Sequence, residues 1–236
     1  MGKRWLPLEA NPDVLNEFAK ELGLEVSQCS FHDVYGLDTE LLAMVPSPVL
    51  ALLLLFPTTD ASAAASKAEA ERLKEEGYAP PKAAYFMKQT IGNACGTIGV
   101  LHSLANNQDA ISVSKGSFLQ RFLTATADMD AAQRGAYLED PPEGAPDIDQ
   151  AHHAAAQEGA TQPPSLDEVV VLHFVALVQK AGRLLELDGN KPFPIDHGAS
   201  SPETLLQDAA KIARQFMESN GSIQFNLIAL CQAPPG

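Results

Sequence analysis

The sequence of 236 residues has little of what marks several protein classes. Its three cysteines, Cys29, Cys95 and Cys231, are an odd, sparse set that excludes a disulfide framework and favours a reducing compartment. These cysteines and the histidines lack the spacing of a zinc site. Lys and Arg number only 16 against 30 Asp and Glu, and the net charge of −14 argues against nucleic acid or an anionic membrane as a partner.

Long apolar runs are also missing. The strongly apolar run 49–56 is much shorter than the roughly 20 residues that span a bilayer, and residues 1–9 lack the apolar stretch of a signal peptide. We therefore expect a cytoplasmic protein, with the nucleus as an alternative, that binds no membrane. Hydrophobic residues make up 45% and charged residues 19%, as is typical of a globular chain able to bury a sizeable core.

What is present is an alternation of helical and extended patterns along the whole chain. Capping residues, apolar periodicity and breakers predict helices over 12–22, 38–43, 61–76, 94–106, 117–127, 130–138 and 202–219. Apolar runs predict strands over 49–56, 169–179, 184–188, 192–195 and 222–230. No repeat or linker is visible, so we expect a single α/β (α+β) domain over residues 1–236, with a mostly antiparallel sheet flanked by helices.

One long segment, residues 139–167, breaks this alternation. It is rich in proline, acidic and small residues and has little to bury. A loop of this length inside a compact domain is uncommon and usually functional or disordered. His152 and His153 lie within it, and we expect both to be solvated.

Residues 89–99 carry the strongest chemical signal. Cys95 stands between small residues where a loop meets a helix, and Gln89 precedes it on the loop. With Asn93 as N-cap, Cys95 would occupy the first helical turn, where negative charge is favoured and backbone N–H groups are unpaired. Because a thiolate is the attacking species, this place suits a nucleophile. The Gln89 amide and the free N–H groups could then receive the developing oxyanion.

A partner for the thiol is found by counting along two strands. His173 lies in an otherwise apolar strand, where a polar side chain is costly unless it is satisfied. If 169–179 and 184–188 form a hairpin that turns at Ala181 and Gly182, Asp188 lies diagonal to His173 on the same face, within side-chain reach. Asp188 would then orient His173, and His173 would take the proton of Cys95. The alternatives are a core histidine bonded to backbone and a turn aspartate.

These residues resemble the ubiquitin carboxyl-terminal hydrolases, small papain-like cysteine peptidases, and in particular their short single-domain members. The resemblance rests on segments 5–12, 33–36, 53–57, 89–99, 105–107, 172–178, 186–189, 191–194 and 197–198. It implies a central antiparallel sheet with helices on both sides and a knotted backbone. It also implies that residues 139–167 form an active-site crossover loop, which limits what can be attached beyond the last glycine of ubiquitin.

The same resemblance assigns the site residues. Cys95 would be the nucleophile, His173 the general base and acid, Asp188 the residue that orients His173, and Gln89 the oxyanion-hole residue. No cofactor or metal would be needed. The expected partner is ubiquitin or a ubiquitin-like protein such as Nedd8, acted on by a monomeric enzyme.

The function predicted is therefore a deubiquitinating thiol peptidase that hydrolyses small adducts from the C-terminal glycine of ubiquitin through an acyl-enzyme. One alternative is a ubiquitin-binding or ubiquitin-stabilising module with little turnover. Another is a papain-like acyltransferase that passes the acyl group to an amine. An acidic enzyme should attract the arginines of the ubiquitin tail, which would raise the association rate and make it salt-sensitive.

Overall fold

One antiparallel sheet organises the molecule, whose computed structural model describes residues 2–162, 164–165, 168, 170–220 and 224–233. Within these residues six strands pair in the order β1-β6-β2-β3-β4-β5. The strands are β1 (Cys29–Asp33), β2 (Val49–Pro57), β3 (Leu172–Lys180), β4 (Arg183–Leu187), β5 (Ile195–Ala199) and β6 (Asn226–Gln232).

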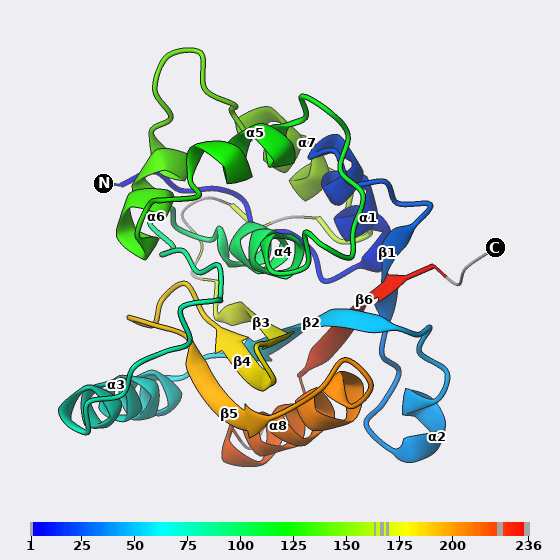
Figure 1. The fold of residues 1–236 in the computed structure, drawn as a ribbon, viewed down its shortest axis with the longest axis vertical. Coiled ribbons are helices and arrows are strands. Elements are labelled where there is room, and N and C mark those ends of the chain that lie inside the picture. The colour runs from blue at the N-terminus through cyan, green and yellow to red at the C-terminus, as the bar shows by residue number, and fades with distance from the viewer. Residues whose placement is uncertain (1, 163, 166–167, 169, 221–223, 234–236) are drawn as a thin grey trace.

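Helices cover both faces of this sheet (Figure 1). Above it in that view lie α1 (Pro12–Glu21), α4 (Cys95–Ala105), α5 (Phe118–Ala125), α6 (Ala131–Glu139) and α7 (Asp149–Gln157). Below it lie α2 (Thr39–Leu42), α3 (Asp60–Glu75) and α8 (Leu205–Asn220). The sequence-based fold class is thereby confirmed, whereas the knotted path of the backbone stays a prediction.

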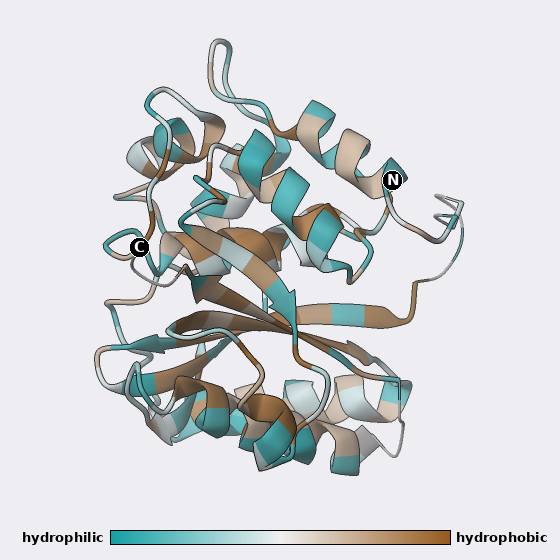
Figure 2. Ribbon diagram, turned by 90° about the vertical axis from the view of Figure 1, so that its right-hand side faces the viewer, coloured by the Kyte–Doolittle hydropathy of each residue, from teal (hydrophilic) through white to brown (hydrophobic). Residues whose placement is uncertain are grey.

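Two apolar cores, one on each face of the sheet, explain why its central strands read as continuous apolar runs. In β2, Leu53 belongs to the core under α4, whereas Leu52 and Leu54 belong to the core over α8. Figure 2 shows the apolar residues concentrated along the sheet and the inward faces of the helices. Because both sides of β2 are covered, no polar alternation is needed.

Small residues let α4 approach the sheet closely. A Cβ added at Gly99 would lie 2.9 Å from Leu53 Cδ2, and one added at Gly96 would lie 3.1 Å from Leu8 Cβ. The two glycines that follow the cysteine therefore allow the helix to pack closely on the sheet and on the N-terminal segment. This packing fixes the N-terminus of α4, and with it Cys95, above the sheet.

The predicted hairpin is present in the predicted register. Lys180 pairs with Arg183 and Ala176 with Leu187. The turn residues Ala181 and Gly182 have φ of 52° and 76°, and positive φ at both central residues is what a tight type I′ turn requires. The paired part of β4 ends at Leu187, so the next residue is free to turn toward the start of β3.

Other expectations were wrong in detail. Strand β1 was not predicted, and the segment 139–167 contains the helix α7. The strand expected at 192–195 is instead β5, because Pro192 and Pro194 have no N–H to donate to a ladder. Parts of the predicted strands at 169 and 222–223, and of the loop at 163 and 166–167, lie outside the described residues. None of the described helices is long and apolar enough to cross a bilayer.

Candidate active site

Cys95 is the first residue of α4, and 7% of its surface is exposed. The N-cap is Ala94, which provides no side-chain cap, so the expectation that Asn93 caps this helix was wrong. Asn93 has a φ of 61°, and its Nδ2 donates to the Trp5 carbonyl at 3.1 Å. The asparagine therefore turns the chain before the helix and ties it to the N-terminal segment. The predicted place of the thiol, at a helix N-terminus, is correct.

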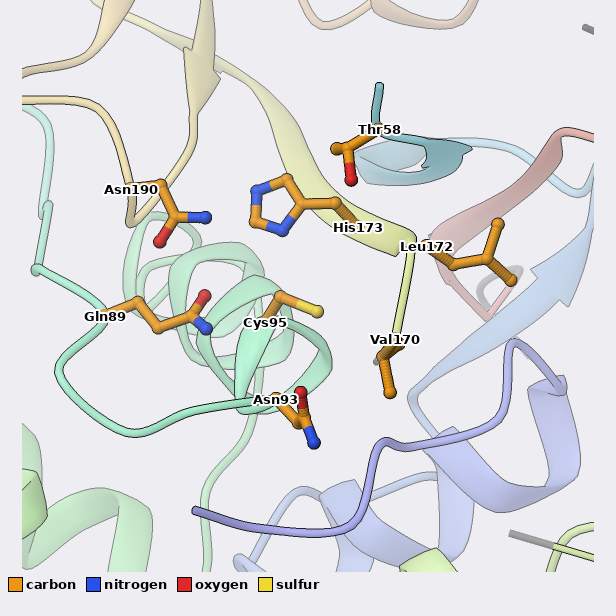
Figure 3. Close-up of a pocket in the computed structure, with 8 residues that line it drawn as sticks. All are labelled: Thr58, Gln89, Asn93, Cys95, Val170, Leu172, His173 and Asn190. Carbon is orange, nitrogen blue, oxygen red and sulfur yellow. The ribbon is translucent and has the colours of Figure 1, made fainter. Parts of the chain in front are cut away.

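His173 and Asp188 form the predicted contact. His173 lies at the start of β3 and is 8% exposed, and its Nε2 donates to Asp188 Oδ1 at 2.8 Å. Because Nε2 is engaged with the carboxylate, Nδ1 is the ring nitrogen that faces Cys95 (Figure 3). The carboxylate thus fixes the plane and orientation of the ring.

The pair is held in its charged form. Burial by itself would lower the pKa of His173, but the hydrogen bond to Asp188 and the neighbouring Cys95 raise that pKa to about 10. Burial would raise the pKa of Asp188, but its hydrogen bond with His173 and the positive charge of the ring bring that pKa below its usual value. His173 is therefore protonated at neutral pH, the state that stabilises an adjacent thiolate.

Gln89 reaches the same place from the segment before α4. Its backbone N–H donates to the Gly189 carbonyl at 3.0 Å, and its side-chain Nε2 donates to the Ile91 carbonyl at 3.2 Å. An amide nitrogen has two N–H groups, so one remains to donate elsewhere. Figure 3 shows this amide directed toward Cys95. A Cβ on Gly189 would lie 2.8 Å from Gln89 Cβ, so the two segments approach this closely only because residue 189 is glycine.

A pocket of about 170 Å³ brings the predicted residues together (Figure 3). Gln89, Cys95 and His173 line it, and Asp188 supports His173. The pocket is also lined by Asn93, which was expected only as a helix cap, and by residues that sequence reasoning did not assign, namely Thr58, Val170, Leu172 and Asn190. Their position next to motif residues was a signal, but no chemistry in their side chains distinguished them from ordinary turn and strand residues.

The arrangement can perform nucleophilic acyl transfer. It combines a thiol at a helix N-terminus, a protonated imidazole fixed by a carboxylate, and the Gln89 side-chain amide in the same pocket. Over the part of the chain that the structure describes, no group of three or more His, Cys, Asp or Glu residues is placed to hold a metal ion.

The structure corrects the expectation for one histidine of the 139–167 segment. His152 lies on α7 and is 1% exposed, with its Nδ1 2.7 Å from Thr97 Oγ1 and its Nε2 2.8 Å from the Leu6 carbonyl. Its ring stacks on Trp5 at 4.1 Å. Burial lowers its pKa to about 4. This histidine is therefore a neutral internal tie between α7, α4 and the N-terminal segment, whereas His153 is exposed as expected.

Two further histidines make polar contacts inside the structure. His197 lies on β5 and donates from Nε2 to the buried Glu186 at 2.9 Å. His102, on α4, is fully buried, and its Nε2 accepts the Met87 N–H at 3.1 Å. Its contact supports the extended segment that leads to Gln89. These polar contacts join segments distant in sequence, which residue patterns did not indicate.

Comparison with known proteins identifies the family of the chain. Residues 5–218 match the family described as "Ubiquitin carboxyl-terminal hydrolase, family 1". Ubiquitin carboxyl-terminal hydrolase 3 of Arabidopsis thaliana is 48% identical over 234 residues, which are 97% of this chain and 94% of that protein. The human ubiquitin carboxyl-terminal hydrolase isozyme L1 is 45% identical over 228 residues, covering 96% and 98% of the two chains.

Solved structures also share the fold. The Trichinella spiralis UCH37 catalytic domain, bound to ubiquitin vinyl methyl ester, superposes with a TM-score of 0.72 at 22% identity, covering 98% of this chain and 96% of that one. Taken with the family match over most of the sequence, these findings show that the chain belongs to the ubiquitin carboxyl-terminal hydrolase family.

Proposed function

We propose that this protein is a cysteine-type ubiquitinyl hydrolase that removes small adducts from the C-terminal glycine of ubiquitin. The observation that carries the proposal is the buried His173–Asp188 pair beside a cysteine at a helix N-terminus. Family membership and the close relatives named ubiquitin carboxyl-terminal hydrolase support the choice of substrate.

In the proposed mechanism, the Cys95 sulfur attacks the carbonyl carbon of the terminal glycine, and the C=O electron pair moves onto oxygen. The Gln89 amide and the Cys95 backbone N–H donate to this oxyanion. The tetrahedral intermediate then collapses, the bond to the leaving nitrogen breaks, and His173 gives that nitrogen its proton. Asp188 keeps the imidazole in place throughout.

The second half of the reaction uses the same groups. A water molecule attacks the thioester carbonyl while His173 accepts one of its protons, and the C–S bond breaks to release the carboxylic acid and the thiolate. The acid then loses its remaining proton to solvent. The pocket of about 170 Å³ leaves room for a backbone that carries no side chains, such as the two glycines at the end of the ubiquitin tail. The apolar side chains of Val170 and Leu172 line its wall.

The decisive test is covalent capture together with turnover. Ubiquitin carrying a C-terminal vinyl methyl ester should add once, at Cys95, and Cys95→Ser should lose both this adduct and hydrolysis of a fluorogenic ubiquitin amide while still binding ubiquitin. Burial raises the pKa of Cys29 and of Cys231 to about 12, so neither should react. Cys231→Ala is the control and should react normally.

Two outcomes would contradict the proposal: an adduct on another residue, or full turnover by Cys95→Ser. Ubiquitin binding without turnover in the wild-type protein would instead favour a binding module. A matched Nedd8 probe tests whether a ubiquitin-like protein is also accepted. The monomeric state and the cytoplasmic or nuclear location stay predictions from the sequence.

A further inference from the structure

A second buried charged cluster lies behind the site. Glu186 on β4 is 1% exposed, and its two carboxylate oxygens lie 2.9 Å from Lys191 Nζ and 2.9 Å from His197 Nε2. Burial would raise the pKa of Glu186, but the hydrogen bond from His197 and the positive charge of Lys191 hold it below its usual value. A buried carboxylate is costly unless it is paired, so Glu186 constrains the positions of the Lys191 and His197 side chains.

Lys191 connects this cluster to the active site. It is 8% exposed, and its Nζ also lies 3.0 Å from Glu69 Oε2 on α3. Its backbone N–H donates to the Asp188 carbonyl at 2.9 Å. The side chains of Glu186 and Lys191 therefore close the chain from 186 to 191 into a ring, and Asp188 is one of its members.

The turn inside this ring determines the orientation of Asp188. The Asn190 N–H donates to Asp188 Oδ1 at 2.9 Å, the same oxygen that accepts the hydrogen bond from His173 Nε2. Asn190 itself lines the catalytic pocket. Lys88 Nζ also donates to this turn, at the Asn190 and Lys191 carbonyls, at 3.1 and 2.5 Å. The turn 188–191 is thus held by Lys88 through two of its carbonyls and by the Glu186–Lys191 pair.

We propose that Glu186 and Lys191 are positioning residues for catalysis, because their buried ion pair sets the turn that aims the Asp188 carboxylate at His173. This inference rests on the proposed function. Neither side chain lines the pocket, so they act through Asp188 and Asn190. A displacement of about 1 Å in such a group can cost up to about 100-fold in rate.

The test uses Lys191→Met, which keeps the length of the side chain and leaves Glu186 paired with His197, together with Glu186→Gln. Each should lower kcat by about 3-fold to 100-fold with KM nearly unchanged, because the substrate pocket keeps its lining residues. The double variant should lose about as much as either single variant, because both belong to one pair. Lys211→Met removes a surface ion pair with Asp208 and is the matched control, expected to be unchanged.

A second measurement needs no substrate. Titration of the imidazole of His173, followed by NMR in Lys191→Met, should give a pKa about one pH unit or more closer to that of free histidine, because the carboxylate no longer faces the ring. A merely structural role would lower the melting temperature and leave that titration in place, which would overturn the inference. Additive losses in the double variant would do the same. If the His173 titration shifts while the wild-type protein hydrolyses no ubiquitin substrate, the proposed function fails and the positioning role stands.

Discussion

Replacing Asp188 by asparagine separates the charge of the carboxylate from its hydrogen bonds. Oδ1 of the aspartate accepts from both His173 Nε2 and the Asn190 N–H, and the amide oxygen of an asparagine can accept both bonds in the same place. The variant therefore preserves the ring orientation while removing the negative charge 2.8 Å from the ring.

The expected loss follows from the interaction that disappears. Hydrogen bonds to charged groups are worth about 1.5 kcal/mol more than neutral ones. Two unit charges about 4 Å apart interact by about 4 kcal/mol at the effective dielectric constant of about 20 that suits partly buried sites. An imidazolium less stable by about 1.5–4 kcal/mol corresponds to a kcat lower by about 10-fold to 1000-fold.

The same loss should appear in the pH profile. Because the charge of Asp188 raises the pKa of His173, its removal should move the basic limb of kcat/KM to lower pH by about 1–3 pH units. The assay is hydrolysis of a fluorogenic ubiquitin amide across the pH range, with ubiquitin affinity measured separately and expected to be unchanged. Asp109→Asn, which makes the same charge change at an exposed residue, is the control.

Wild-type kcat and an unmoved basic limb in Asp188→Asn would refute the electrostatic role of the carboxylate. If Asp188→Asn instead leaves much of the protein unfolded, and the fraction that stays folded reacts normally with an active-site probe, Asp188 is a structural residue. Equal effects of the exposed control and of Asp188→Asn would indicate a general charge effect.

Two further changes test the packing around the site. Gly189→Ala should push Gln89 away, lowering kcat by up to about 100-fold and stability by about 1–3 kcal/mol, and wild-type kinetics would show that the close approach is unimportant. His152→Leu should cost about 2–4 kcal/mol in urea unfolding, since Thr97 and a carbonyl lose their partner, whereas His153→Leu should cost little. Because the pKa of His152 is about 4 in the folded protein, the unfolding free energy of the wild-type protein should fall as the pH decreases from about 6.5 to 4. In His152→Leu this fall should be less steep, and equal slopes in the two proteins would contradict the prediction.

The core of the site could be predicted because its residues obey local rules. Helix N-terminal chemistry located Cys95, and counting across a two-residue turn placed Asp188 near His173. Both inferences depend only on the period of a strand and the polarity of a helix end. The detail that failed at this junction was the N-cap, since Asn93 has positive φ and uses its amide to bind the N-terminal segment.

What could not be predicted depends on contacts between distant segments. A proline-rich, acidic context concealed α7, and nothing near His152 indicated that Thr97 and the Leu6 carbonyl would satisfy it. The Glu186–Lys191 pair was missed for a related reason, because a charged residue in a strand normally indicates a solvated face. Strand β1 lies at the sheet edge and is too short and polar to give a strong pattern.

The order of the strands has a consequence for synthesis on the ribosome. β6, the latest strand in the sequence, lies between β1 and β2, two of the earliest. Until residue 232 leaves the exit tunnel, β1 lacks its neighbour and one side of β2 is an open, apolar edge. The nascent chain must therefore keep a gap between β1 and β2 and receive its last strand there, so loss of a few residues from β6 would separate β1 from the rest of the sheet rather than trim its margin.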